Sequence, residues 1–213
     1  MQRGWQAVGR GMALMAWSLG ALAAPEDDFK RGELAYQRGD VVGAMAALRP
    51  ATLAKHAPSL TLLAFILDRA DYPDQALGLY RDAAEQDDAE GHIGLANLYL
   101  TGRGVAKDEK QALAHFSKAA DLGQATAIDA IATAWLRGQL GLNAEAEPAQ
   151  ARAALLRAAE RGHLASAEAL AQAYGQGRYG LAVNPAEAAR WQARVAEWRK
   201  QRSPKLAAAK AAR

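Results

Sequence analysis

The chain repeats itself in steps of 36 to 39 residues, and this internal period limits its possible folds more than any other feature. The segment KAADLG at residues 118–123 recurs as RAAERG at residues 157–162 and as DAAEQD at residues 82–87. In each copy a further alanine lies seven residues before the first alanine of the motif, giving the pairs Ala76 and Ala83, Ala112 and Ala119, and Ala151 and Ala158. Seven residues make two helical turns, so each pair predicts a buried stripe on one helix.

A second helical pattern precedes each of these motifs. A large residue, a small residue and an aromatic residue recur with one spacing, as Leu95-Ala96-x-x-Tyr99, Ile131-Ala132-x-x-Trp135 and Leu170-Ala171-x-x-Tyr174. Glycines separate this pattern from the alanine motif that follows it, which is typical of a turn between two helices. Because a single helix pair cannot bury its own apolar face, the pairs are expected to stack on one another.

Composition favours the same conclusion. The chain has 54 alanines but only 10 valines and isoleucines together. Alanine is the best helix former, whereas β-branched residues favour strands. We therefore predict an all-α protein, a right-handed α-solenoid of about five antiparallel helix pairs.

Residues 89–124 resemble a Sel1-like repeat, whose hallmark is L-G-x-x-Y-x-x-G-x-G-V-x-x-D, followed by K-A, an aromatic residue and K-A-A-x-x-G. Residues 125–163 and 164–199 match the Sel1-like pattern more loosely. Residues 24–88 resemble two tetratricopeptide-like helix pairs, because Ala44 and Ala76 are separated by a shorter step of 32 residues. The matching residues of the first segment are Leu95, Tyr99, Gly102, Gly104, Val105, Asp108, Ala112, Phe116, Lys118, Ala119, Ala120 and Gly123.

The resemblance implies a non-enzymatic adaptor that binds protein partners on the concave face of a superhelix and needs no cofactor. Residues 137–172 also resemble the late repeats of alginate-secretion scaffold lipoproteins, although this chain lacks a lipid-anchor cysteine. That second resemblance implies a role in an envelope complex for exopolysaccharide synthesis or export. A periplasmic regulator of a sensor kinase or another signalling protein is the alternative that the family implies.

The N-terminus predicts export. Arg3 and Arg10 precede an apolar run, and small residues at Ala21 and Ala23 suit a signal peptidase. We predict a signal peptide at residues 1–23, cleavage after Ala23 and a periplasmic protein without a stable membrane span. Retention of the segment as an uncleaved anchor is the alternative.

The charges predict a mildly acidic body with a basic tail. Residues 24–198 carry 18 basic and 23 acidic residues, whereas residues 199–213 carry six basic residues and no acid. This distribution does not predict nucleic-acid binding by the body. The basic tail at residues 200–213 is expected to be a solvated helix extension or a disordered end, or to contact an acidic partner or anionic lipid. Before it, Trp191 and Trp198 predict an apolar stripe that caps the solenoid or meets a partner.

Candidate catalytic and metal-binding groups are few. The absence of cysteine excludes thiolate zinc sites and a cysteine nucleophile. The histidines do not pair at helical spacing, and His92 and His163 are predicted to be ordinary surface residues at helix beginnings. Tyr99, Trp135 and Tyr174 could form a sugar-stacking platform, but their common register favours core packing. We predict neither an enzyme nor a metal site.

The binding surface follows from repeat geometry. If the first helix of each pair lines the concave side, the positions two before and two after its large core residue face the partner. The first row is Thr61, Ile93, Asp129 and Glu168, and the second row is Phe65, Asn97, Thr133 and Gln172. This mixed polar surface is typical of a site for a peptide or a loop.

Overall fold

The structure, a computed structural model, describes residues 24–211, with side chains described for residues 24–201. The predicted signal peptide at residues 1–23 lies outside the described residues. Within the described part every regular element is an α-helix, which confirms the predicted fold class and helix number. The ten helices are α1 (Pro25–Gln37), α2 (Val41–Leu53), α3 (Ala57–Arg69), α4 (Pro73–Ala84), α5 (Ala89–Thr101), α6 (Glu109–Asp121), α7 (Ala125–Arg137), α8 (Pro148–Glu160), α9 (Leu164–Gln176) and α10 (Pro185–Ala211).

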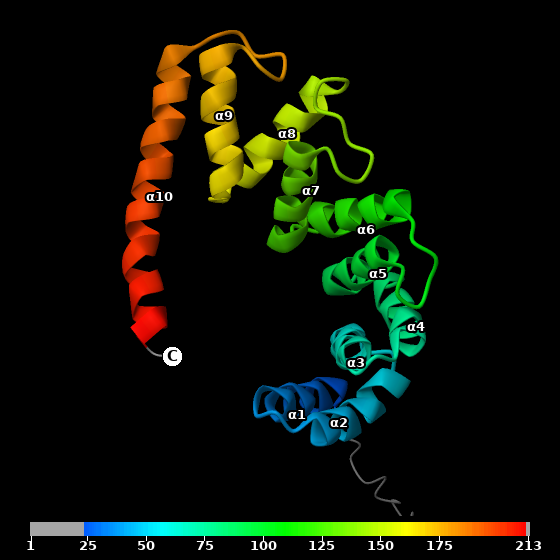
Figure 1. Cartoon of the computed structure of the whole chain (residues 1–213). Coiled ribbons are helices and arrows are strands. Elements are labelled where there is room, and N and C mark those ends of the chain that lie inside the picture. The colour runs from blue at the N-terminus through cyan, green and yellow to red at the C-terminus, as the bar shows by residue number, and fades with distance from the viewer. Residues whose placement is uncertain (1–23, 212–213) are drawn as a thin grey trace, which may run out of the picture.

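The helices stack as pairs along a curved solenoid (Figure 1). Each helix packs against its neighbours in the chain, most extensively within α1–α2, α3–α4, α5–α6 and α9–α10. The first helices of successive pairs also touch one another, since α3 contacts α1 and α5, and α7 contacts α9. These first helices border the hollow of the arc, whereas α2 and α4 lie on its outer side. The predicted binding rows assumed that the first helices line the concave side, and in the structure they border it.

Small side chains let the helices approach closely. All six alanines of the repeated pairs, from Ala76 to Ala158, have no exposed surface. Gly91, Ala127 and Ser166, which lie four residues before the large residue of the second pattern, are buried as well. Close approach maximises dispersion contacts along each crossing, so these positions hold the pairs together.

The core is continuous along the solenoid. One buried cluster extends over α2–α5 and a second over α5–α10, and the Tyr99 side chain packs against both. Trp135 is buried and Tyr174 packs against the second cluster, so the aromatic register reflects core packing rather than a sugar-stacking platform. Trp191 is buried in the second cluster and Trp198 packs against that cluster, with the Arg194 guanidinium over both rings. The tryptophan stripe therefore caps the solenoid.

The turns follow from local sequence. Asp108 accepts hydrogen bonds from the backbone N–H groups of Lys110 and Gln111 and so caps α6. Gly102 ends α5 with φ of 72°, a left-handed conformation that is strained for residues with a Cβ.

At the C-terminal end of the solenoid, α10 continues through the basic tail to Ala211. The backbone of the tail is thus helical as far as Ala211.

A matched pair of helical glycines tests the packing. A Cβ at Gly94 in α5 would overlap the buried Tyr80 ring, whereas a Cβ at Gly78 in α4 would meet nothing within 4 Å. We expect Gly94→Ala to lower the free energy of unfolding by about 1–3 kcal/mol through overpacking. We expect Gly78→Ala to raise it by up to about 1 kcal/mol, because alanine is the better helix former. Chemical denaturation measures both, and equal effects of the two variants would contradict this packing.

Candidate functional site

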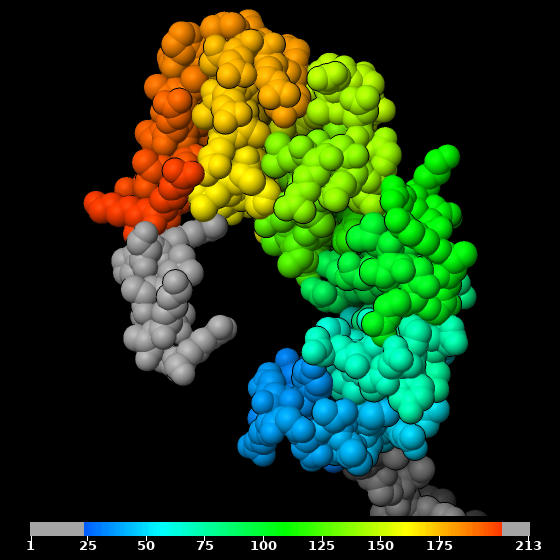
Figure 2. Space-filling model, viewed as in Figure 1, coloured from blue at the N-terminus to red at the C-terminus, as the bar shows by residue number. Residues whose placement is uncertain are grey.

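The concave side of the arc is hollowed (Figure 2), and a groove opens there between three first helices. We call it the α1–α3–α5 groove; its volume is about 700 Å³. Its apolar lining comes mainly from Phe29, Tyr36, Pro58, Leu62, Phe65 and Ile93.

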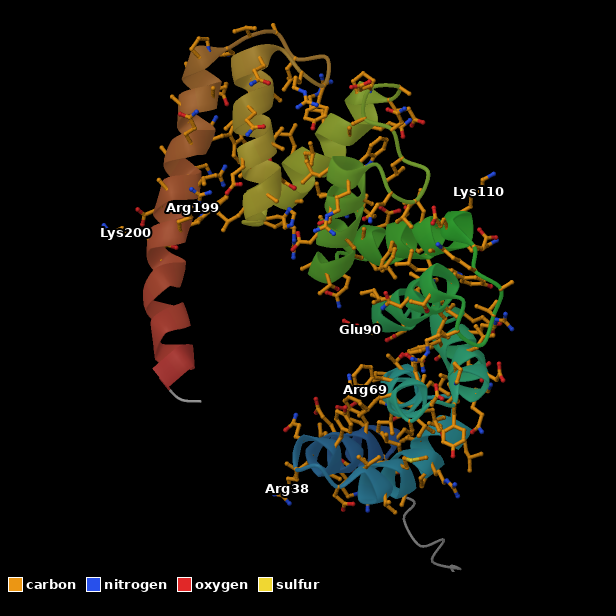
Figure 3. The ribbon with its side chains drawn as sticks, viewed as in Figure 1. Arg38, Arg69, Glu90, Lys110, Arg199 and Lys200 are labelled. Carbon is orange, nitrogen blue, oxygen red and sulfur yellow. The ribbon has the colours of Figure 1, made fainter. Side chains whose placement is uncertain are left out.

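Aromatic contacts order one wall of the groove. The Phe65 ring lies edge-on to Tyr36 with centroids 5.9 Å apart, although Phe65 remains 40% exposed. On its other side the Arg69 guanidinium lies over the Phe65 ring, 5.8 Å from the centroid. Figure 3 shows Arg69 beside α3 on the side of the hollow. An exposed aromatic ring held in place by its neighbours can bury apolar surface of a partner at little entropic cost.

The groove also carries carboxylates. Asp88 caps α5 by accepting a hydrogen bond of 2.6 Å from the Gly91 N–H, and it accepts a second one of 2.8 Å from the Thr61 hydroxyl. Glu90, in the first turn of α5, points toward the hollow (Figure 3) and accepts a hydrogen bond from the Gln124 side-chain amide. Glu33 of α1 is the third acid of the lining.

The charged side chains that line the groove are all acids. Partial burial, with the Asp88 carboxylate as second cause, raises the pKa of Glu90 above its usual range. Burial first, and then the charges of Asp68 and Glu90, raise the pKa of the Tyr80 hydroxyl, which also lines the groove. A cation placed here would relieve this repulsion.

Other cavities lie along the solenoid, and two of them contain predicted binding residues. One of about 720 Å³ lies between α5, α6 and α7 and shares Asn97 with the first groove. Another of about 330 Å³ lies between α9 and α10. In both, a carboxylate already has a cationic neighbour: Lys107 pairs with Glu109 at 3.1 Å, and Arg199 pairs with Glu168 at 2.7 Å.

The structure divides the predicted binding rows among these cavities. Thr61, Phe65, Ile93 and Asn97 meet in the α1–α3–α5 groove, whereas Thr133 lies in the second cavity and Glu168 and Gln172 in the third. Asp129 is half-buried and lines none of the three. The continuous rows that repeat geometry suggested are thus interrupted, because the solenoid curves and α10 lies against α9. The role of all eight residues in binding stays a prediction.

Sequence reasoning missed the contribution of α1 to the groove. Phe29, Glu33 and Tyr36 lie in the most degenerate copy of the repeat, where no glycine or aromatic register marks the inner face. Tyr36 lies two positions after Leu34 and thus corresponds to the second predicted binding row of the later repeats. For Glu33 and Glu90 the sequence carries no comparable signal, because acids are ordinary on exposed helix faces.

The prediction for His92 is wrong, since this side chain is buried rather than on the surface. Its Nδ1 atom lies 3.1 Å from Nδ1 of His115, which is stacked on Tyr99 with centroids 5.6 Å apart. The Nε2 atom of His92 is buried without a hydrogen-bond partner. The two histidines are 23 residues apart and meet only because α5 and α6 pair, so local spacing could not reveal them.

The other two histidines have a structural role that recurs. His56 and His163 stand immediately before α3 and α9, and each lies within hydrogen-bond distance of a buried serine three residues later. The distances are 2.9 Å from His56 Nδ1 to Ser59 Oγ and 2.7 Å from His163 Nδ1 to Ser166 Oγ. The buried hydroxyls are thereby satisfied.

Neither a metal centre nor a membrane span emerges from the described residues. In that part of the chain no three His, Asp or Glu side chains gather closely enough to hold a metal ion. Residues 24–211 likewise include no helix whose length and hydropathy would let it cross a bilayer.

Comparison with known proteins decides what kind of repeat this is. The Sel1 repeat family matches residues 68–88, 89–124 and 164–192. The chain contains Sel1 repeats. The first match lies within the segment predicted to be tetratricopeptide-like, and the division of the solenoid into repeat types stays a prediction. Proteins with Sel1 repeats generally mediate protein–protein interaction and form a non-catalytic scaffold family.

Solved Sel1-repeat structures share this fold. The protein c5321, a protective antigen of uropathogenic Escherichia coli with an SLR fold, is similar with a TM-score of 0.69 and 21% identity, over 81% of this chain and 38% of that chain. A Sel1 repeat protein from Oxalobacter formigenes has a TM-score of 0.64 and 24% identity, over 82% of this chain and 73% of its own. These identities establish the fold alone.

One curated relative is similar in sequence. An uncharacterized protein of Neisseria meningitidis serogroup B, NMB1327, is 35% identical over 106 residues, which are 47% of this chain and 22% of the relative. The chain therefore corresponds to about a fifth of that relative's length.

The buried histidine pair of α5 and α6 predicts that the stability of this protein is sensitive to acid. Burial is the main cause that lowers the pKa of both rings; the His115 pKa is lowered further by His92 and Arg81. For His92, Lys118 lowers the pKa, whereas Asp87 and Asp88 oppose the shift. The unfolded chain therefore binds more protons below the ordinary histidine pKa of 6.5. Stability is fully present above that pH and is lost as the pH falls toward the folded pKa values.

We expect the free energy of unfolding to decrease from about pH 7.5 to about pH 5.5, and His115→Gln to reduce this decrease. Urea denaturation at a series of pH values measures it. His163→Gln is the matched control, because it removes a histidine outside the pair. The same pH dependence in the wild type and both variants would contradict a role for the pair.

Proposed function

We propose that this protein is an exported adaptor that binds a protein partner on the concave face of its solenoid, within an envelope complex. The single observation that carries the proposal is the α1–α3–α5 groove, which combines exposed aromatic surface with carboxylates on the inner side of a Sel1-repeat arc. Since Sel1 repeats generally mediate protein–protein interaction, a formed groove on the inner helices is the natural place for a partner.

The groove is organised before any partner arrives. The Thr61 hydroxyl joins α3 to the capping residue Asp88 of α5, so these two helices are held together at the groove. On the α1 side, the Phe29 ring lies edge-on to His56 with centroids 5.8 Å apart. A surface fixed in this way loses little conformational entropy on binding.

The envelope context rests on the sequence. The basic and apolar pattern of residues 1–23 supports export to the periplasm. The similarity of residues 137–172 to alginate-secretion scaffolds supports a place in an exopolysaccharide synthesis or export complex. Regulation of a sensor kinase is the second candidate that the family resemblance supports.

Site-specific photo-crosslinking in the native host tests the adaptor role. Asn97 is exposed and lines both the α1–α3–α5 groove and the neighbouring cavity, so a p-benzoylphenylalanine in its place is expected to crosslink the partner. Lys110 points away from the hollow (Figure 3) and is the matched control. We expect a discrete adduct from position 97 and none from position 110, detected by immunoblotting.

The identity of the adduct distinguishes the two contexts. Export or synthase components would support the scaffold, whereas a sensor kinase would favour the regulator. Adducts of the same kind from both positions, or none from position 97, would contradict partner binding on the concave face.

Export is tested by the mature N-terminus. We expect the protein in the periplasmic fraction to begin at Ala24, because Ala21 and Ala23 occupy the two small-residue positions before the predicted cleavage site. N-terminal sequencing or intact-mass measurement of the fractionated protein checks this. A protein that begins at Met1 in the membrane fraction would instead identify residues 1–23 as a retained anchor.

A further inference from the structure

The carboxylates of the α1–α3–α5 groove differ from those of the other two cavities. Its charged lining residues are all acids: Glu33, Asp88 and Glu90. Among the described side chains, no lysine or arginine forms an ion pair with any of the three. The second and third cavities contain the pairs Lys107–Glu109 and Arg199–Glu168. Of these three cavities, only the α1–α3–α5 groove is lined by acids that have no ion pair among the described side chains.

Two of these acids are available to a ligand. The Asp88 carboxylate already accepts hydrogen bonds from the Gly91 N–H and the Thr61 hydroxyl. Glu33 is exposed, and Glu90 has a neutral partner, the Gln124 amide, while its nearby charge is the like charge of Asp88. A ligand cation beside Glu33 or Glu90 would form charge-assisted hydrogen bonds that the free protein lacks.

The apolar part of the groove lies beside these acids. Thr61 faces the Asp88 end of the groove, and Phe65 follows one turn later along α3, against Tyr36. Arg69, one turn further, contacts the Phe65 ring and so lies toward the end of α3 opposite to Thr61. Along α3 the groove thus places a carboxylate beside Thr61 and an exposed aromatic ring one turn later, and a matching ligand carries a cation next to a bulky apolar group.

The shape favours a chain over a compact molecule. Asn97 lines both the α1–α3–α5 groove and the cavity between α5 and α7, so the hollowed surface continues along the solenoid. An extended peptide can follow such a track, with successive side chains in successive depressions.

We propose that the α1–α3–α5 groove binds a peptide segment of the partner protein in which Lys or Arg stands next to a bulky apolar residue. Phe65, Tyr36 and Ile93 contact the apolar side chain, and Glu33 and Glu90 bind the cation. This inference rests on the proposed adaptor function and adds the chemical class of the partner segment. Complementary charge supplies specificity and a faster association rate, while burial of the apolar anchor supplies most of the affinity.

Selection from a random library of linear dodecapeptides, displayed on phage, tests this with the purified protein. We expect wild-type protein to enrich peptides with Lys or Arg beside Phe, Tyr, Trp or Leu. The dissociation constants of the enriched peptides, measured by fluorescence anisotropy, are expected to rise at least about tenfold with Phe65→Ala. They are expected to rise about three- to tenfold with the double variant Glu33→Gln and Glu90→Gln.

Charge reversal provides the sharper comparison. Glu33→Lys with Glu90→Lys is expected to enrich peptides with Asp or Glu in place of the basic residue. Glu85→Lys with Glu160→Lys is the matched control, because both acids are exposed outside the groove and make the same change in net charge. Circular dichroism confirms that each variant is folded before its selection is compared with that of the wild type.

The outcomes separate this inference from the proposed function. Enriched peptides that depend on Phe65 but show no basic preference would overturn the inference and leave the adaptor function intact. The absence of enriched peptides, or binding that Phe65→Ala does not change, would also overturn it, and crosslinking at position 97 would then decide the adaptor function by itself.

A synthetic peptide of residues 199–213 has six cations but only Leu206 as a large apolar residue. If it bound as tightly as the selected peptides, a second copy of this chain would replace the partner protein as the occupant.

Discussion

Contact between small side chains at the helix crossings is the interaction on which the rest of the structure depends. The alanine pairs on α4, α6 and α8 have no exposed surface, and on α5 even a methyl group at Gly91 would lie 2.8 Å from the Cβ of Ala83. Backbones that approach this closely leave little freedom in the crossing geometry, since a larger residue would have to push the helices apart. The same kind of contact recurs from pair to pair, and its repetition produces the arc with its concave face.

This mode of packing leaves many large side chains for the inner surface. While small residues fill the crossings, the aromatic residues Phe65 and Tyr36 line the hollow, where they can contact a partner. The cavities also differ in how their acids are paired. Glu109 and Glu168 form ion pairs with Lys107 and Arg199 in the other two cavities, whereas the acids of the α1–α3–α5 groove have no such cation among the described side chains. The residues that determine the fold are therefore different from the groove residues expected to determine which partner binds.

The histidines show how the same residue type acquires different roles in one fold. His56 and His163 bond to serines three residues away, which is an interaction within one helix turn. His92 and His115 meet across the α5–α6 pair and share a buried site with an unpartnered nitrogen. The first arrangement is local and recurs as H-x-x-S in the sequence, whereas the second depends on the relative position of α5 and α6 in the helix pair.

Much of this protein was determined by the sequence alone. The helix number, the buried alanines, the glycine turn at Gly102 and the core position of Trp135 follow from short-range periodicity, because a helix repeats its faces every 3.6 residues. The same periodicity predicted that Thr61, Phe65, Ile93 and Asn97 lie on the inner side, and they meet in one groove. Tertiary structure alone decided that Glu33 and Tyr36 join them from α1, that Arg199 pairs with Glu168, and that Asp129 lines none of the three cavities. The reason is physical: local spacing defines which face a residue occupies, but the accumulated crossing angles and the return of α10 decide which faces meet.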